Sequence, residues 1–153
     1  MTLALESRHL ESIRRRAEAA YPEEACGLIG GLWEGETGGD RKTGVTLVPL
    51  LNARRDSRRN RYRIDPESVR RAQERLDRDG LEIVGVYHSH PDHPPKPSAY
   101  DREHGWPRLS YVIVEVRRGR AGVPRSWVLR DDRTGFVEEP VTMEGKIVWQ
   151  SPF

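Results

Sequence analysis

The chain of 153 residues lacks several features that define particular classes of protein. It has one cysteine, Cys26, so no internal disulfide can form, as is usual in a reducing compartment. No apolar run approaches the roughly 20 residues that a membrane helix needs, and the first residues lack the apolar core of a signal peptide. These absences predict a cytoplasmic protein that does not interact with a membrane.

Lysine is scarce as well, since three lysines stand against 23 arginines. The net charge is only +2, so charge alone does not indicate a nucleic-acid partner. Codon bias is the simpler interpretation of the excess of arginine, and a functional one stays open because arginine also favours pairing with carboxylates. The polar segment 52–63 contains an arginine cluster made up of Arg54, Arg55, Arg58, Arg59, Arg61 and Arg63. Apart from Tyr62 it has no aromatic residue, so a surface that stacks on nucleic-acid bases is not favoured.

The apolar residues, 35% of the chain, form periodic segments that predict one folded domain over residues 1–153. Residues 7–20 have helical spacing, with Ser7 in the N-cap position. Asp65 and Pro66 begin a second helix, which Gly80 ends. Strands are expected at residues 25–33, 45–51, 81–87, 110–116, 126–130 and 136–141, with a short one at 147–149. This predicts an α/β (α+β) fold, in which one mixed sheet of about six strands is flanked by two main helices.

Residues 84–101 contain the pattern that carries the chemistry. An apolar strand delivers His88 and His90, which point to the same face because side chains along a strand alternate with a period of two. A proline-rich loop follows and returns at Asp101. Two imidazoles and a carboxylate are three ligands for a zinc ion, and a catalytic zinc keeps its fourth position for water. We therefore expect one Zn²⁺ per chain.

Other histidines and acidic residues leave alternatives open around this site. Four of the five histidines fall within 17 residues, so His93 and His104 also need an interpretation. His93 lies among prolines at a loop tip and could approach the ion, whereas His104 fits a helix surface or a supporting position. Asp92 follows His90 in a tight turn, so we rank it below Asp101 as a ligand.

A zinc-bound water needs a base, and spacing alone does not identify it. Glu82 points along its strand away from the site, and Glu67 has a simpler role in the first turn of a helix. Glu23 and Glu24 both remain candidates because they begin a glycine-rich strand that another part of the chain can approach closely. Ser98 could cap a short helix that ends before residue 107, or its hydroxyl could donate to an oxyanion.

Two segments together resemble a known family. H-S-H-P at residues 88–91 and the aspartate within P-S-A-Y-D at 97–101 resemble the JAMM motif of the MPN-domain metalloproteases, which is H-x-H, ten residues and an aspartate. The upstream P-E-E-A-C-G-L-I-G resembles the P-x-E-x-C-G segment of that family. Asn52 and the helix start at Asp65 are further matches. The resemblance extends over about residues 7–140.

The resemblance implies a cytidine-deaminase-like MPN fold and a zinc hydrolase. Active members cut peptide or isopeptide bonds after the C-terminal glycine of ubiquitin-like proteins. By this resemblance, His88, His90 and Asp101 bind the zinc, Glu24 is the general base and acid, and Ser98 stabilises the oxyanion. All five positions keep the residue type that the family pattern requires.

The chain is similar in length to the stand-alone prokaryotic members of the family. Those resemble enzymes that release cysteine or another small adduct from a thiocarboxylate sulfur-carrier protein, which has a ubiquitin-like fold and a Gly-Gly tail. The resemblance therefore implies such a carrier as the partner, with the arginine cluster as a candidate docking surface for it. Two other hypotheses are a catalytically inactive MPN scaffold or protein-binding module, and a cysteine hydrolase that uses Cys26.

Overall fold

The computed structural model of the chain describes residues 1–35, 41–52 and 64–149. The arginine cluster lies outside the described residues. Among the helices described, none combines the length and the apolar character that crossing a membrane requires.

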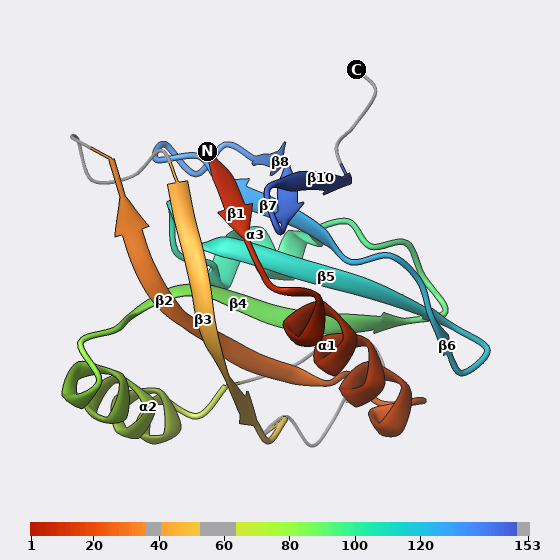
Figure 1. The fold of residues 1–153 in the computed structure, drawn as a ribbon. Helices are drawn as coiled ribbons and strands as arrows, with labels where there is room; N and C mark the ends of the chain where they lie inside the picture. Colours follow the sequence, from red (N-terminus) through yellow and green to blue (C-terminus); the bar gives the residue numbers. More distant parts are fainter. Residues whose placement is uncertain (36–40, 53–63, 150–153) are drawn as a thin grey trace.

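Ten strands form one sheet (Figure 1). They are β1 Thr2–Ala4, β2 Cys26–Glu34, β3 Arg41–Leu50, β4 Glu82–Pro91, β5 Ser110–Arg117, β6 Arg120–Ala121, β7 Arg125–Leu129, β8 Phe136–Glu139, β9 Val141–Met143 and β10 Lys146–Trp149. Their order is β10-β9-β1-β3-β2-β4-β5-β7-β8, and β6 pairs with β5. The pairs β1–β3, β1–β9 and β4–β5 are parallel and the others antiparallel. The predicted mixed sheet is thus confirmed, but it has more strands than expected.

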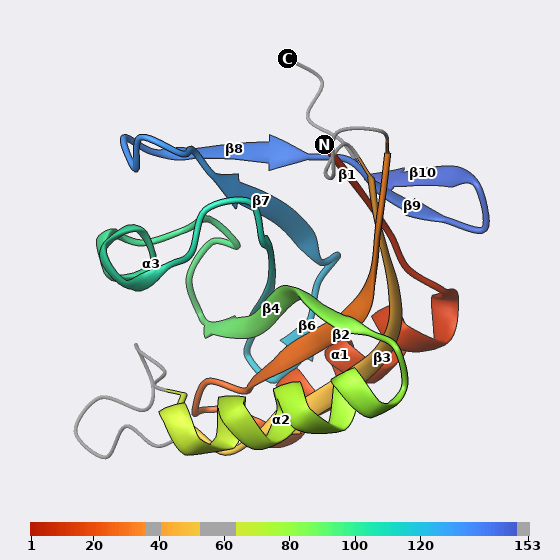
Figure 2. The same ribbon diagram turned by 90° about the vertical axis from the view of Figure 1, so that its left-hand side faces the viewer.

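The strand predicted at residues 136–141 is wrong in one respect, because Pro140 divides it. Proline has no N–H to give to a ladder, so β8 ends at Glu139 and Val141 begins β9. In the sheet order β8 is the last strand and β9 the second from the other end, although one residue separates them in sequence. The sheet therefore curls until its ends approach, as Figure 2 shows, and Leu3 N donates to Pro140 O at 3.1 Å across the junction.

Helices cover opposite faces of the central strands. On α1, Ser7–Ala20, the residues Leu10 and Ile13 pack in a cluster with Ile29 and Tyr87 of β2 and β4. On α2, Pro66–Arg78, the buried residues Ala72 and Leu76 pack in a second cluster with Leu28, which is the neighbour of Ile29 along β2. Adjacent residues of a strand face opposite sides, so the two helices enclose the middle of the sheet. The short α3, Ala99–His104, lies beside the end of β4 (Figure 2).

The helix termini test the predicted caps. Asp65 accepts a hydrogen bond from Ser68 N at 3.2 Å and so caps α2 as predicted, and Gly80 follows the helix with φ 70°. The prediction that Ser7 caps α1 is wrong. Glu6 occupies the N-cap without a side-chain bond, and Ser7 is the first helical residue, because the chain is still extended at Glu6.

A buried ion pair lies where the sheet ends approach. Lys42 of β3 and Glu139 of β8 are 0% and 3% exposed, with Nζ and Oε2 3.3 Å apart. Lys42 Nζ also donates to Arg108 O at 3.0 Å. The hydroxyls of Ser110 and Ser126 donate to Glu139 Oε1 at 2.5 and 2.7 Å. Burial lowers the pKa of Lys42, and the attraction of Glu139 opposes this shift. Because both charges are removed from water, the charged state of the pair depends on its mutual attraction and on the hydrogen bonds around it.

Replacing this lysine should destabilise the protein strongly. Lys42→Met keeps most of the side-chain volume but leaves the Glu139 carboxylate buried without its cation, so the free energy of unfolding should fall by about 3–5 kcal/mol. Denaturant titration followed by circular dichroism measures it. The control is the exposed Arg70, which pairs with Glu67 and Glu74 on α2, and Arg70→Ala should cost about 0.5 kcal/mol. Equal losses in both variants would contradict a stabilising role for the buried pair.

Candidate metal centre

His88 and His90 both lie within β4, which runs to Pro91, beyond the predicted end of the strand at residue 87. The strand continues because β2 and β5 flank it, with His88 opposite Cys26 on one side and Ile113 on the other. The two imidazoles point to the same face as predicted, with their Nε2 atoms 3.2 Å apart. Both residues are buried, at 1% and 2% exposure.

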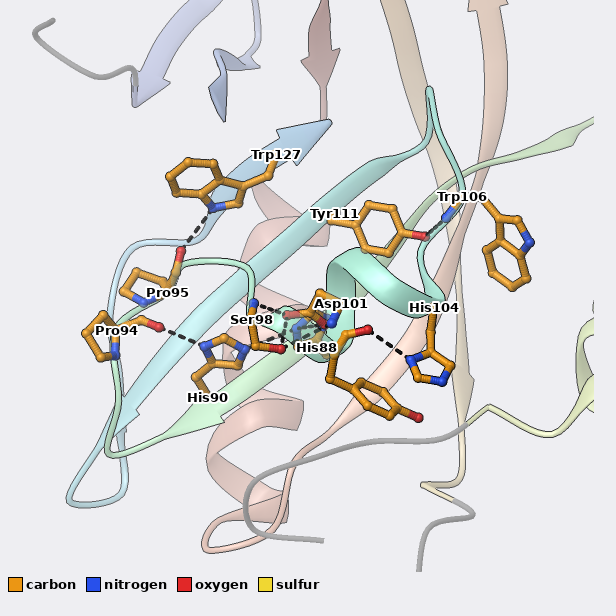
Figure 3. Close-up of polar contacts among 11 residues, drawn as sticks. His88, His90, Pro94, Pro95, Ser98, Asp101, His104, Trp106, Tyr111 and Trp127 are labelled. Carbon is orange, nitrogen blue, oxygen red and sulfur yellow. Dashed lines mark hydrogen bonds and ion pairs between the residues drawn. The ribbon is translucent and has the colours of Figure 1, made fainter. Parts of the chain in front are cut away.

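Asp101 reaches these histidines through the cap of α3. Ser98 is the N-cap, and Asp101 N donates to its Oγ at 3.2 Å. In return, the backbone N and the hydroxyl of Ser98 donate to Asp101 Oδ2 at 2.6 and 2.9 Å (Figure 3). This capping box leaves Asp101 Oδ1 directed at His88, 3.4 Å from its Nε2. The predicted cap at Ser98 is therefore confirmed, and it fixes the orientation of the carboxylate.

The proline-rich loop sets the protonation of His90. Its Nδ1 lies 2.7 Å from Pro94 O (Figure 3), and a carbonyl can only accept, so Nδ1 carries the proton. Burial above all, with the neighbouring His88, lowers the pKa of His90 to about 3. The ring is then neutral, and Nε2 presents its lone pair towards His88 and Asp101. Trp127 Nε1 donates to Pro95 O at 3.0 Å and holds the loop in place.

Glu24 approaches from the chain segment just before β2 and is 3% exposed. Two hydrogen bonds tie that segment to β4: Ala25 N donates to Ser89 Oγ at 2.8 Å, and Ser89 N donates to Ala25 O at 3.1 Å. Among the described residues, the Glu24 Oε2 atom has no hydrogen-bond partner. Burial, and secondarily the charge of Asp101, raises the pKa of Glu24 to about 9. A buried carboxyl oxygen without a protein donor is unusual, and a bound ion, an ordered water or a catalytic role can account for it.

The structure separates the other candidates. Glu23 is exposed, and Glu82 begins β4 at the end remote from the histidines. Asp92 is occupied by Tyr21 Oη at 2.6 Å and Arg118 N at 2.8 Å, which agrees with its lower rank as a ligand.

The two remaining histidines differ in position. His104 lies on the surface of α3 and stacks on Tyr100, as one of its two interpretations expected. His93, which the sequence left open, stacks on His90 beside the site.

The ligand atoms fit a divalent cation. One nitrogen from each of His88 and His90 and one oxygen of Asp101 lie within 4.8 Å of one another, and all three residues are buried. Burial by itself would raise the pKa of Asp101, but His88 and the hydrogen bonds from Ser98 outweigh it and hold that pKa below its usual range. A charged carboxylate and two imidazoles converging on one point match the set of three protein ligands that a catalytic zinc usually has.

Comparison with known proteins identifies relatives of the chain. Residues 6–130 match the family described as prokaryotic homologs of the JAB domain. The chain is 34% identical over 116 residues to a desampylase of Haloferax volcanii, an alignment that covers 74% of this chain and 78% of that protein. It is also 34% identical over 113 residues to a "Probable TtuB-protein conjugate cleaving protease" of Thermus thermophilus, covering 73% and 69%.

Solved structures show the same fold. The solution structure of a protein from Desulfitobacterium hafniense is similar with a TM-score of 0.78 and 29% identity, over 95% of each chain. The crystal structure of a JAB1/MPN domain protein from Archaeoglobus fulgidus has a TM-score of 0.52 and 19% identity, over 93% of this chain and 96% of that one, and supports the fold alone. The mixed sheet with flanking helices that the resemblance implied is confirmed. The chain belongs to the family of prokaryotic homologues of the JAB domain.

Proposed function

We propose that the protein is a zinc-dependent metallopeptidase that hydrolyses the peptide or isopeptide bond after the C-terminal glycine of a ubiquitin-like or sulfur-carrier protein. The observation that carries this proposal is the convergence of His88, His90 and Asp101 beside the buried carboxylate of Glu24. The relative from Thermus thermophilus is named as a protease that cleaves TtuB-protein conjugates, which supports a protein conjugate as substrate.

Each residue has a defined task in this proposal. His88, His90 and Asp101 would hold the zinc, which would act as a Lewis acid and bring the pKa of water there to about 7. Glu24 takes a proton from the attacking water and hands it to the leaving amine as the bond from the glycine carbonyl carbon to that nitrogen breaks. The products are a carrier ending in a glycine carboxylate and a free amine.

Ser98 is the proposed donor to the oxyanion. Its hydroxyl donates to Asp101 Oδ2 in this structure, so it has to rotate to reach a substrate oxygen. The backbone N of Ser98 donates to the same carboxylate oxygen at 2.6 Å and does not depend on that rotation. Asp101 therefore keeps its orientation while the hydroxyl changes partner.

A cleavage assay tests the function. The substrate is a sulfur carrier of ubiquitin-like fold whose C-terminal Gly-Gly is joined to a lysine side chain of a second protein. We expect mass spectrometry to show the carrier released with a free glycine carboxylate, chelation to stop the reaction, and added zinc to restore it. Intact conjugate in the presence of zinc-loaded protein would favour the inactive scaffold instead. Cys26 is buried, and burial with the nearby Glu24 raises the pKa of its thiol to about 12, which opposes a cysteine hydrolase.

Four finer parts of the proposal rest on the sequence. Docking of the carrier on the arginine cluster stays a prediction, because those residues lie outside the described part of the chain. A cytoplasmic location, the Gly-Gly tail of the carrier and the absence of a nucleic-acid partner also stay predictions.

A further inference from the structure

A second group of possible metal ligands overlaps the three proposed zinc ligands at His90. The carboxylate of Glu24 and one ring nitrogen each of His90 and His93 form a second group of ligand atoms within 4.8 Å of one another. His93 is half-buried, whereas Glu24 and His90 are buried. The proposed mechanism uses Glu24 as a base and gives His93 no task.

The loop holds His93 in a fixed orientation. Its ring stacks on that of His90, with centroids 4.1 Å apart and planes 17° from parallel. Its Nδ1 lies 2.8 Å from Pro91 O and therefore carries the ring proton, because a carbonyl can only accept. Nε2 is then the nitrogen that can bind a metal. His93 is thus presented as a metal-ligating histidine usually is, with its other nitrogen donating to a carbonyl.

Glu24 supplies the second, independent indication. It is 3% exposed, and its Oε2 has no hydrogen-bond partner among the residues that the structure describes. A carboxyl group buried in this way either stays protonated or, when it is ionised, is compensated by a cation or by donors from outside the described protein surroundings.

His90 cannot serve two ions at once. Its Nδ1 is engaged with Pro94 O, so only Nε2 can bind a metal, and the first ion takes it. When that ion is bound, Glu24 and His93 are the two members of the second group that can still bind a metal. Two ligands hold zinc less tightly than three, so a second ion would bind at higher concentration than the first.

We propose that Glu24 and His93 bind a second, weaker divalent cation of the zinc type, next to the ion held by His88, His90 and Asp101. The position of the first ion rests on the proposed function. A carboxylate that coordinates a cation cannot take a proton from water, so filling the second position removes the base. Excess zinc therefore inhibits this protein, and His93 determines how strongly.

Zinc titration of chelator-stripped protein, followed by calorimetry and by equilibrium dialysis, tests the proposal. We expect two binding events in the wild type, the second more than about tenfold weaker. His93→Asn should lose the second event and keep the first. His104→Asn is the matched control, because His104 also has Nδ1 on a backbone carbonyl, 3.0 Å from Tyr100 O, and also stacks on a neighbouring ring, but lies outside the site. This variant should keep both events.

The ratio of activity at excess zinc to activity at one equivalent is the second readout. It should be low in the wild type and in His104→Asn and rise towards one in His93→Asn. A single binding event in the wild type, or an unchanged second event in His93→Asn, would overturn the proposal and leave the proposed function intact. The proposed function is tested separately by His88→Ala, which should lose the first, tight binding event. A failure of the second cation site can therefore be told apart from a failure of the proposed zinc site.

Discussion

Glu24→Gln should lower turnover by about two to four orders of magnitude while one zinc ion stays tightly bound. The expected loss is that of a general base and acid, because Glu24 is not among the three residues proposed to hold the first ion. Ala25 N and Ala25 O are hydrogen-bonded to Ser89, so the segment stays in place whatever side chain stands at position 24. Steady-state kinetics on a Gly-Gly conjugate and the zinc content of the same sample are the measurements.

Glutamine is a close mimic of the protonated, neutral form of Glu24, which the fold already accommodates. Burial, with the charge of Asp101, raises the pKa of Glu24 to about 9, so without a cation the side chain is neutral at pH 7. Glu24→Gln then changes no charge in the metal-free protein and should fold normally. A divalent cation nearby lowers the pKa of this carboxyl and gives the base its charge. The variant therefore isolates the proton-transfer step.

Glu23→Gln is the control for this prediction. Glu23 is adjacent in sequence but exposed, so the control should keep both its zinc content and its turnover within about twofold of the wild type. Full turnover in Glu24→Gln would remove Glu24 from the mechanism. Loss of tight zinc in Glu24→Gln would instead place it among the ligands of the first ion.

Local sequence rules were sufficient for much of the site. The period of two along a strand placed His88 and His90 on one face, and the proline-rich loop was expected to return Asp101 to them. The cap at Ser98 was one of two roles predicted for that residue, and the structure adds that it orients Asp101. The end of β4 was predicted too early because two histidines and a serine interrupt the apolar run, although flanking strands bury them all. Polar residues that are buried for function do not follow the hydrophobic pattern from which strands are predicted.

Long-range features were not predictable in the same way. Choosing Glu24 over Glu23 depended on a resemblance, since only the fold buries one and exposes the other. The three-residue strands β1 and β9 are too short for a periodic signal, and each forms because the curled sheet brings a partner to it. The pairing of Lys42 with Glu139 follows from that closure. No pattern of residue spacing in the sequence predicts that these two residues pair.

His88→Ala should abolish tight zinc binding and reduce activity to background. His88 Nε2 lies within 3.4 Å of both His90 Nε2 and Asp101 Oδ1, so its removal leaves two of the three proposed ligands of the first ion without the third. Affinity should fall by more than about 100-fold, given that even supporting residues around a metal cost up to this factor. Calorimetric titration with zinc measures the loss.

Because the variant frees His90, weak binding through Glu24, His90 and His93 should remain, and the double variant His88→Ala/His93→Asn should lose that as well. Tight zinc retained in His88→Ala would contradict the ligand set on which the proposed hydrolase depends.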